Sequence, residues 1–134
     1  MIVIDTNIIG YLYINSNLSH QAEKVYLKDP DWAAPLLWRS ELRNVLALYI
    51  RKNLLTLPDA QGIMRSAMSL MQEHEFEVPS DQVLKLAAMS GCSAYDCEFV
   101  ALAQDLDLPL VTVDREILKK FPETAVLLDV FSAE

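Results

Sequence analysis

Residues 2–7 read Ile-Val-Ile-Asp-Thr-Asn, a short apolar run that ends in an acid and two further residues suited to capping a helix. The apolar residues fit a buried strand, and a helix is expected to follow through Ile8 to Ile14. Strands that alternate with helices build parallel sheets. The opening therefore predicts a parallel sheet with Asp5 directly after its first strand.

The same alternation continues along the chain. Further strands are expected at residues 32–34, 76–78, 110–113 and 125–130. Helices are expected from the cap Ser19 to residue 28, at 37–52, at 58–74, at 81–90 after the cap Ser80, at 94–106 after the cap Ser93, and in a short segment ending at Lys120. We predict one α/β domain over residues 1–134, in three layers, with a central parallel sheet flanked by helices.

Composition excludes several classes of protein. No apolar run approaches the roughly 20 residues of a membrane span, and no basic segment precedes the first strand, so we expect a cytoplasmic protein without membrane contact. The two cysteines, Cys92 and Cys97, make no disulfide framework and are expected to be partly buried. Only three glycines occur, so a glycine-rich phosphate loop is absent.

The net charge of −8 argues against a broad basic surface for nucleic acid. It does not argue against a nucleic-acid enzyme whose acids gather at a metal site, where four carboxylate ligands would account for half of that charge.

Two acids follow predicted strands. Asp5 and Asp114 should lie at the carboxyl edge of a parallel sheet, where ligands bind in such folds. For each acid the structural alternative is that it serves as the N-cap of the helix that follows it.

Two further acids lie on the apolar sides of predicted helices. On a helical projection, Glu41 falls between Leu48 and Val45, where an ionised carboxylate needs a partner. Asp96 falls between Ala103 and Val100 in the same way. A buried salt bridge for Glu41, and a capping box formed by Ser93 and Asp96, are the structural alternatives. Glu98 and Asp105 fall outside the apolar arc of their helix and are expected to be ordinary solvated acids, and His20 and His74 are expected at the surface.

Four carboxylates at one edge would repel each other, at roughly 3 kcal/mol per pair for a separation of about 5 Å and a dielectric near 20. Protons or a cation must therefore occupy such a cluster. Oxygen ligands with no Cys or His nearby favour Mg²⁺ or Mn²⁺. Such a site suits metal-assisted hydrolysis of a phosphodiester, for which no protein nucleophile is needed.

Four segments resemble the acidic motifs of PIN domains, in order and spacing across essentially the full chain. These segments are residues 3–7 (Val-Ile-Asp-Thr-Asn), 38–46 (Trp-Arg-Ser-Glu-Leu-Arg-Asn-Val-Leu), 93–103 (Ser-Ala-Tyr-Asp-Cys-Glu-Phe-Val-Ala-Leu-Ala) and 110–114 (Leu-Val-Thr-Val-Asp). The small size most resembles the VapC-type toxins of prokaryotic toxin–antitoxin pairs.

The resemblance implies an endoribonuclease dependent on Mg²⁺ or Mn²⁺. Its catalytic and metal-binding acids would be Asp5, Glu41, Asp96 and Asp114, with Thr6, Asn7 and Thr112 in support. The implied partners are an RNA substrate, a cognate antitoxin protein and a second copy of the chain in a homodimer.

Other interpretations stay open at this point. Arg115, next to Asp114, is our candidate RNA contact, whereas Arg39, Arg43 and Arg51 share a helix face that is either RNA-binding or simply solvated and salt-bridged. Tyr11, Tyr13 and Tyr26 fit either a dimer surface or the core. A receiver-type phosphotransfer domain would need a Lys at a late strand end, which is missing, and a non-catalytic PIN-like scaffold that binds RNA or a partner protein is the main alternative.

Overall fold

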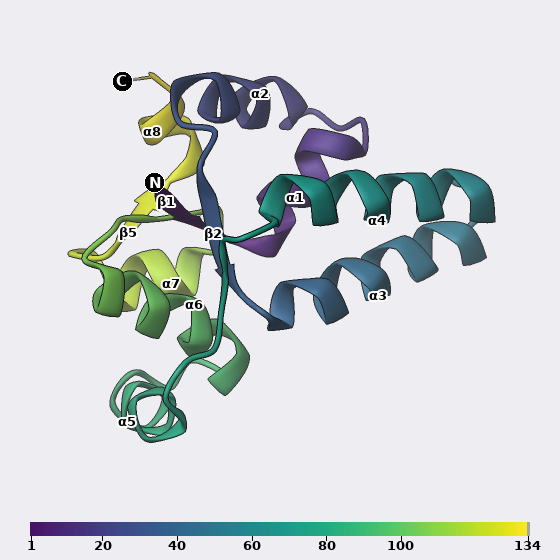
Figure 1. Cartoon of the computed structure of the whole chain (residues 1–134). Coiled ribbons are helices and arrows are strands. Elements are labelled where there is room, and N and C mark those ends of the chain that lie inside the picture. Colours follow the sequence, from purple (N-terminus) through teal and green to yellow (C-terminus); the bar gives the residue numbers. More distant parts are fainter. Residues whose placement is uncertain (134) are drawn as a thin grey trace.

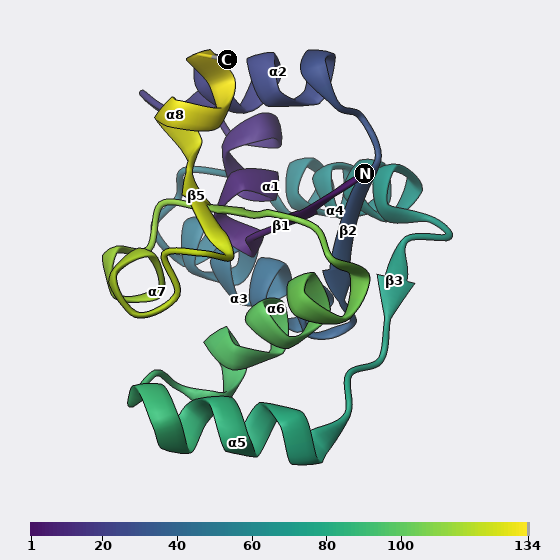
Figure 2. The same cartoon turned by 90° about the vertical axis from the view of Figure 1, so that its left-hand side faces the viewer.

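The computed structural model describes residues 1–133, which form a five-stranded sheet in the order β3-β2-β1-β4-β5. All neighbouring strands pair in parallel. Figure 2 shows β5 and β3 at the two edges of this sheet. The strands are β1 (Ile2–Ile4), β2 (Trp32–Pro35), β3 (Glu75–Phe76), β4 (Leu110–Thr112) and β5 (Ala125–Leu127).

Helices cover both faces of the sheet, which confirms the predicted three-layer α/β architecture. Figure 1 shows α1, α3 and α4 to the right of the strands, α5, α6 and α7 to the left, and α2 beside α8 at the top. The helices are α1 (Thr6–Tyr13), α2 (Ser19–Lys28), α3 (Leu37–Arg51), α4 (Leu57–Met71), α5 (Ser80–Ser90), α6 (Ala94–Leu106), α7 (Arg115–Lys120) and α8 (Leu128–Ala133). Within residues 1–133, none of these helices combines the length and the apolar character that a membrane crossing requires.

The core lies where α6 packs on the central strands. Every residue of β1 and β4 is buried, and six residues of α6 are buried against the sheet. Trp32 and Trp38 are completely buried, and each indole N–H has an acceptor at 2.8 Å, the carbonyl oxygen of Asp29 for Trp32 and Oε2 of Glu75 for Trp38. Burial of these rings therefore costs no unpaired donor.

The strand order creates a crevice beside the central strand. The chain leaves β1 into α1 and leaves β4 into α7, and these helices lie on opposite sides of the sheet (Figure 1). Ligand sites of parallel sheets lie outside the carboxyl ends of strands at such a switch point. The backbone N–H of Asp5 donates to the carbonyl oxygen of Val111 over 3.0 Å, so the ends of β1 and β4 are held side by side.

The predicted last strand is wrong in its second half. The strand stops at Leu127, and α8 occupies Leu128–Ala133. Leu128 is buried and Phe131 packs against the core, which is the i, i+3 spacing of a helix. Lys28 on α2 also donates to the carbonyl oxygen of Phe131 over 2.9 Å, so a neighbouring helix stabilises this turn.

Helix ends differ from expectation by a few residues. Ser19 and Ser80 were predicted to be N-caps, but each is the first residue of its helix. The N-cap positions are occupied by Leu18 and Pro79. The helix predicted to reach residue 74 ends at Met71 because residues 72–74 turn towards β3. Gly91 ends α5 with φ 78°, the left-handed conformation that favours glycine.

Tyr11 and Tyr13 pack against the core, while Tyr26 is 36% exposed and meets Trp32 edge to face. Most of this set therefore contributes to packing within the chain. Cys92 and Cys97 are free and both buried, more so than expected.

Candidate active site

The four predicted acids line one pocket. Asp5, Glu41, Asp96 and Asp114 come from four separate elements and surround a cavity of about 230 Å³ at the carboxyl ends of β1 and β4. The remaining lining residues are Thr6, Asn7, Asn44 and Val45. Residues up to 109 positions apart in the chain thus meet at the crevice that the strand order creates.

Asp5 is held from two sides. Its Oδ1 accepts from the backbone N–H of Thr6 over 2.8 Å, which makes it the N-cap of α1. Its Oδ2 accepts from the hydroxyl of Thr112 over 2.7 Å. The capping interpretation and the site interpretation are therefore compatible, because each carboxylate oxygen keeps a second lone pair.

Two buried threonines link the acids. Thr6 is 4% exposed and donates its hydroxyl to Oε1 of Glu41 over 2.7 Å. Thr112 is completely buried; it donates to Asp5 and accepts from the backbone N–H of Asp114 over 3.0 Å. Both hydroxyls fix carboxylate orientations without adding charge to the pocket.

Asp96 lies in the first turn of α6, and Asp114 is the N-cap of α7. Ser93 caps α6 by accepting from the backbone N–H of Asp96 over 3.1 Å, so the serine half of the predicted capping box forms. Asp114 caps α7, with its Oδ1 accepting from the backbone N–H of Ile117 over 3.0 Å. Helix N-termini stabilise nearby negative charge, which offsets part of the repulsion in the pocket.

Three of the four acids in the pocket have raised pKa values. Burial raises the pKa of Asp5 from 3.8 to about 6, the hydrogen bonds from Thr112 and Thr6 oppose that rise, and the charges of Asp96 and Asp114 add to it. Burial is also the main cause of the raised pKa of Glu41 and of Asp96. Among the ion pairs formed within residues 1–133, none involves these four carboxylates, so the buried salt bridge considered for Glu41 is not found.

Glu98 is not the ordinary solvated acid that we expected. Its side chain is half-buried, burial raises its pKa, and its charge raises the pKa of Glu41. The projection of a single helix shows which residues share a side. It does not show the contacts of α6 with other helices, and Glu98 shares a pocket with Ser80, Val83 and Leu84 of α5.

Asn44 was also missed as a site residue. It lies one helical turn after Glu41 on α3 and lines the acid pocket with an exposed amide side chain. The i, i+3 spacing from Glu41 was the signal that pointed to it.

The arginines considered as RNA contacts have different surroundings in the structure. Arg39 pairs with Glu75 through Nε to Oε2 and through a terminal nitrogen to Oε1, both at 2.6 Å, so it is salt-bridged and away from the pocket. Arg43 contacts Ser40 on its own helix, and Arg115 begins α7 as an exposed side chain. His20 is exposed as expected, whereas His74 is half-buried.

The carboxylate oxygens of the pocket are the type of ligand that a hard cation prefers. All donors are oxygens, and among the hydrogen bonds of residues 1–133 none engages Oε2 of Glu41 or Oδ2 of Asp114. As the side chains stand, no group of three or more His, Cys, Asp or Glu residues in this part of the chain is arranged so that it could hold a metal ion. A bound cation would offset the mutual repulsion of the carboxylates and so allow them to lie closer together.

Comparison with known proteins gives one family. The sequence model of the PIN domain matches residues 2–124. Ribonuclease VapC3 of Pyrobaculum aerophilum is 27% identical over 124 residues, which cover 90% of this chain and 95% of that protein.

Solved structures share the fold. The crystal structure of PAE2754 from Pyrobaculum aerophilum is similar with a TM-score of 0.78 and 23% identity, covering 98% of this chain and 92% of that one. A toxin–antitoxin complex from Klebsiella pneumoniae contains a chain that is similar with a TM-score of 0.70 and 18% identity, covering 96% and 98%.

Proposed function

This chain belongs to the PIN-domain family, and from that premise we propose that it is a metal-dependent ribonuclease that hydrolyses phosphodiester bonds of RNA. The observation that carries the proposal is the pocket lined by Asp5, Glu41, Asp96 and Asp114, none of which pairs with a cationic side chain within residues 1–133. Unpaired carboxylates gathered in one pocket lower the stability of the folded protein, and a bound cation would offset that cost. The relative named Ribonuclease VapC3 supports RNA as the substrate.

We assign the four carboxylates as metal ligands and catalytic residues. Thr112 and Thr6 are positioning residues, because they orient Asp5 and Glu41 through hydrogen bonds of 2.7 Å. Asn7, exposed at the rim of the pocket, is a polar group within reach of a substrate phosphate or sugar.

When bound, Mg²⁺ or Mn²⁺ would supply Lewis-acid polarisation of the phosphodiester and activation of the attacking water. The chain's own contribution is to hold four carboxylates in a partly enclosed pocket and to favour the ionised form of Asp5. Hydrogen bonds to Asp5 serve that second purpose, because they oppose the rise in its pKa caused by burial. Arg115, exposed directly after Asp114, is our proposed phosphate contact.

We further propose that the protein is the toxin of a toxin–antitoxin pair, acts in the cytoplasm as one domain, and is silenced by a cognate antitoxin. The likeness in fold to a chain from a toxin–antitoxin complex supports this role. A homodimer is part of the same proposal. Leu84 and Met89 on α5, which are 63% and 71% exposed, are apolar side chains that a dimer interface would cover.

The test is cleavage of single-stranded RNA by purified, partner-free protein in Mg²⁺ or Mn²⁺, with Asp96→Asn prepared in parallel. We expect the wild-type protein to cut and the variant to fold but not cut, because Asp96 forms no ion pair within residues 1–133. Equal cutting by both would reveal a contaminating nuclease. No cutting by either, across varied RNAs, would favour the non-catalytic scaffold.

A further inference from the structure

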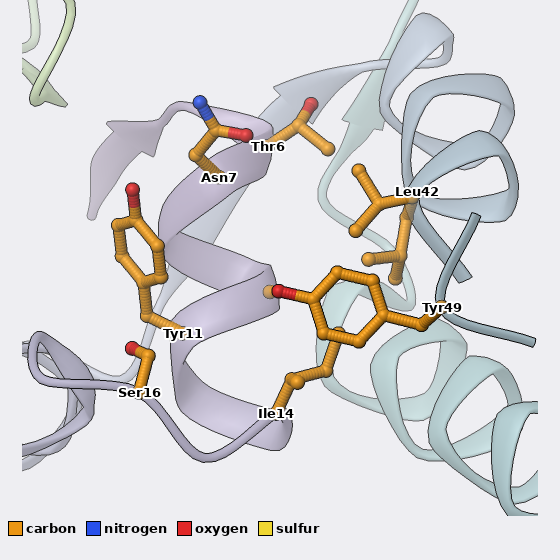
Figure 3. A pocket seen from close by; sticks show the side chains of 9 residues that line it. Thr6, Asn7, Tyr11, Ile14, Ser16, Leu42 and Tyr49 are labelled. Carbon is orange, nitrogen blue, oxygen red and sulfur yellow. The ribbon is translucent and has the colours of Figure 1, made fainter. Parts of the chain in front are cut away.

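A second pocket opens beside the acid pocket. It encloses about 240 Å³ between α1 and α3, and it shares Thr6, Asn7 and Val45 with the acid pocket. Its other lining residues are Gly10, Tyr11, Ile14, Ser16, Leu42 and Tyr49. Figure 3 shows Thr6 and Asn7 at one end and Ile14 and Ser16 at the other, so the pocket leads away from the acids along α1.

The walls combine apolar surface with two aromatic rings. Ile14 and Leu42 are buried, and the half-buried rings of Tyr11 and Tyr49 enter from α1 and α3 (Figure 3). Neither of these tyrosine hydroxyls forms a hydrogen bond within residues 1–133, whereas Tyr13 nearby donates to the carbonyl oxygen of Ser66. The pocket therefore offers ring faces for stacking and two polar groups without a partner in the chain.

Gly10 enlarges the pocket. It lies within α1, where glycine is less stabilising than alanine, and it has neither a positive φ nor a close contact that requires glycine. A Cβ built at Gly10 meets no atom within 4 Å, so the missing side chain leaves open space in the pocket.

The charge of the protein bears on how it would hold RNA. The chain has 11 Lys and Arg against 19 Asp and Glu, so phosphate contacts alone would give a low affinity for RNA. Single-stranded RNA is otherwise held through its bases, which stack on aromatic side chains and form hydrogen bonds at their edges. The second pocket lies next to the acids and has aromatic rings and polar groups of the kind that bind a base.

We propose that this pocket binds the nucleobase of the nucleotide adjacent to the scissile phosphate and so selects the cleavage position. The proposal rests on the proposed ribonuclease function and deepens it. Thr6 and Asn7 belong to both pockets, so a phosphate at the acids leaves its neighbouring base at the mouth of the second pocket. The enclosed volume suits one planar ring system and is too small for a helix of a partner protein.

The test measures binding separately from cleavage. In an Asp96→Asn background with Mg²⁺, we would titrate a single-stranded oligoribonucleotide and versions with one abasic nucleotide moved along it. Gly10→Leu fills the pocket, Gly10→Ala fills it in part, and Gly62→Leu is the matched control, because Gly62 also lies in a helix and meets only the end of the Arg65 side chain at 4.0 Å.

We expect Gly10→Leu to weaken RNA binding roughly tenfold or more, and an abasic nucleotide at one position to do the same, as loss of one stacked base does. Gly10→Ala should weaken binding less while raising the Tm by roughly 3 °C, because alanine is the better helix former. Gly62→Leu should bind as the parent protein does. If Gly10→Leu does not fold, Gly10→Ala and Tyr49→Phe still report on the pocket.

Equal binding of RNA by Gly10→Leu and Gly62→Leu, or binding indifferent to every abasic position, would overturn the proposal. Loss of antitoxin binding alone in Gly10→Leu would assign the pocket to a side chain of a protein partner and would overturn it too. Failure of the ribonuclease proposal is a different result: wild-type protein would not cut RNA, although base-dependent binding in the Asp96→Asn background would persist.

Discussion

The hydroxyl of Thr112 donates to Oδ2 of Asp5 over 2.7 Å, although the two residues are 107 positions apart. The same oxygen of Thr112 accepts from the backbone N–H of Asp114. One buried side chain thus joins the ends of β1 and β4 and orients an acid on each. Thr112 therefore links two acids of the pocket without lining it.

Thr112→Val should impair both stability and catalysis. Valine keeps the shape but removes the donor to Asp5 and the acceptor for Asp114, at a cost of about 1–3 kcal/mol in the free energy of unfolding. The pKa of Asp5 should rise further, because the hydrogen bond from Thr112 lowers it. We expect the acidic limb of the pH–rate profile to move to higher pH, measured with RNA at subsaturating Mg²⁺, where protonation of Asp5 competes with metal binding. Thr112→Ser keeps the hydroxyl and should restore the wild-type profile; an unshifted limb in Thr112→Val would contradict the role.

Glu41→Gln should stabilise the protein in metal-free buffer. The amide oxygen can still accept from Thr6, while the repulsion with Asp5, Asp96 and Glu98 disappears. We expect a rise in Tm of roughly 2–4 °C, the equivalent of about 1 kcal/mol for a chain of this size. Glu116→Gln, at an exposed position of α7, is the control and should leave the Tm unchanged. A lower Tm for Glu41→Gln would mean that the fold relies on its charge.

Stability in metal-free buffer should fall as the pH rises from about 4 to about 6. The folded protein holds the Asp5 proton up to a pKa of about 6, whereas the unfolded chain releases it near 3.8. The folded state therefore binds more protons in this window, and its stability decreases by up to about 3 kcal/mol across it. Urea unfolding at a series of pH values with a chelator measures this slope. Asp5→Asn should flatten it, and Mg²⁺ should restore stability at pH 7; a wild-type stability that rises across the window would refute the assignment.

Arg115 and Arg39 should behave differently towards RNA. Removing a phosphate contact with Arg115→Ala should weaken binding of all sequences alike and reduce the slope of log K against log salt by about one. Arg39→Ala should leave that slope unchanged and lower the Tm, because it breaks the bidentate pair with Glu75. Fluorescence titrations at several salt concentrations separate the two effects. An unchanged slope for Arg115→Ala, with a reduced slope for Arg39→Ala, would place RNA on the α3 face instead.

Much of the architecture could be predicted from local patterns. The apolar run before Asp5 and the acids on the apolar sides of two helices depend only on burial and periodicity, which a sequence displays directly. The burial of Glu98 and the pocket around Gly10 could not be predicted, because they depend on contacts between helices that a sequence does not display. Asn44 could have been found from its i, i+3 spacing to Glu41. The helix at Leu128–Ala133 was missed for a similar reason, since contact with α2 decides its conformation.

The strand order has a consequence for synthesis on the ribosome. The central strand β1 is made first, but one of its two neighbours, β4, is made only after residue 109, and Asp114 follows it. A nascent chain thus carries Asp5 and Glu41 long before Asp114, the last acid of the pocket, is made. Such long-range pairing delays folding until late in translation. A PIN domain with this topology therefore has no complete acid pocket until the end of β4 and Asp114 have been made.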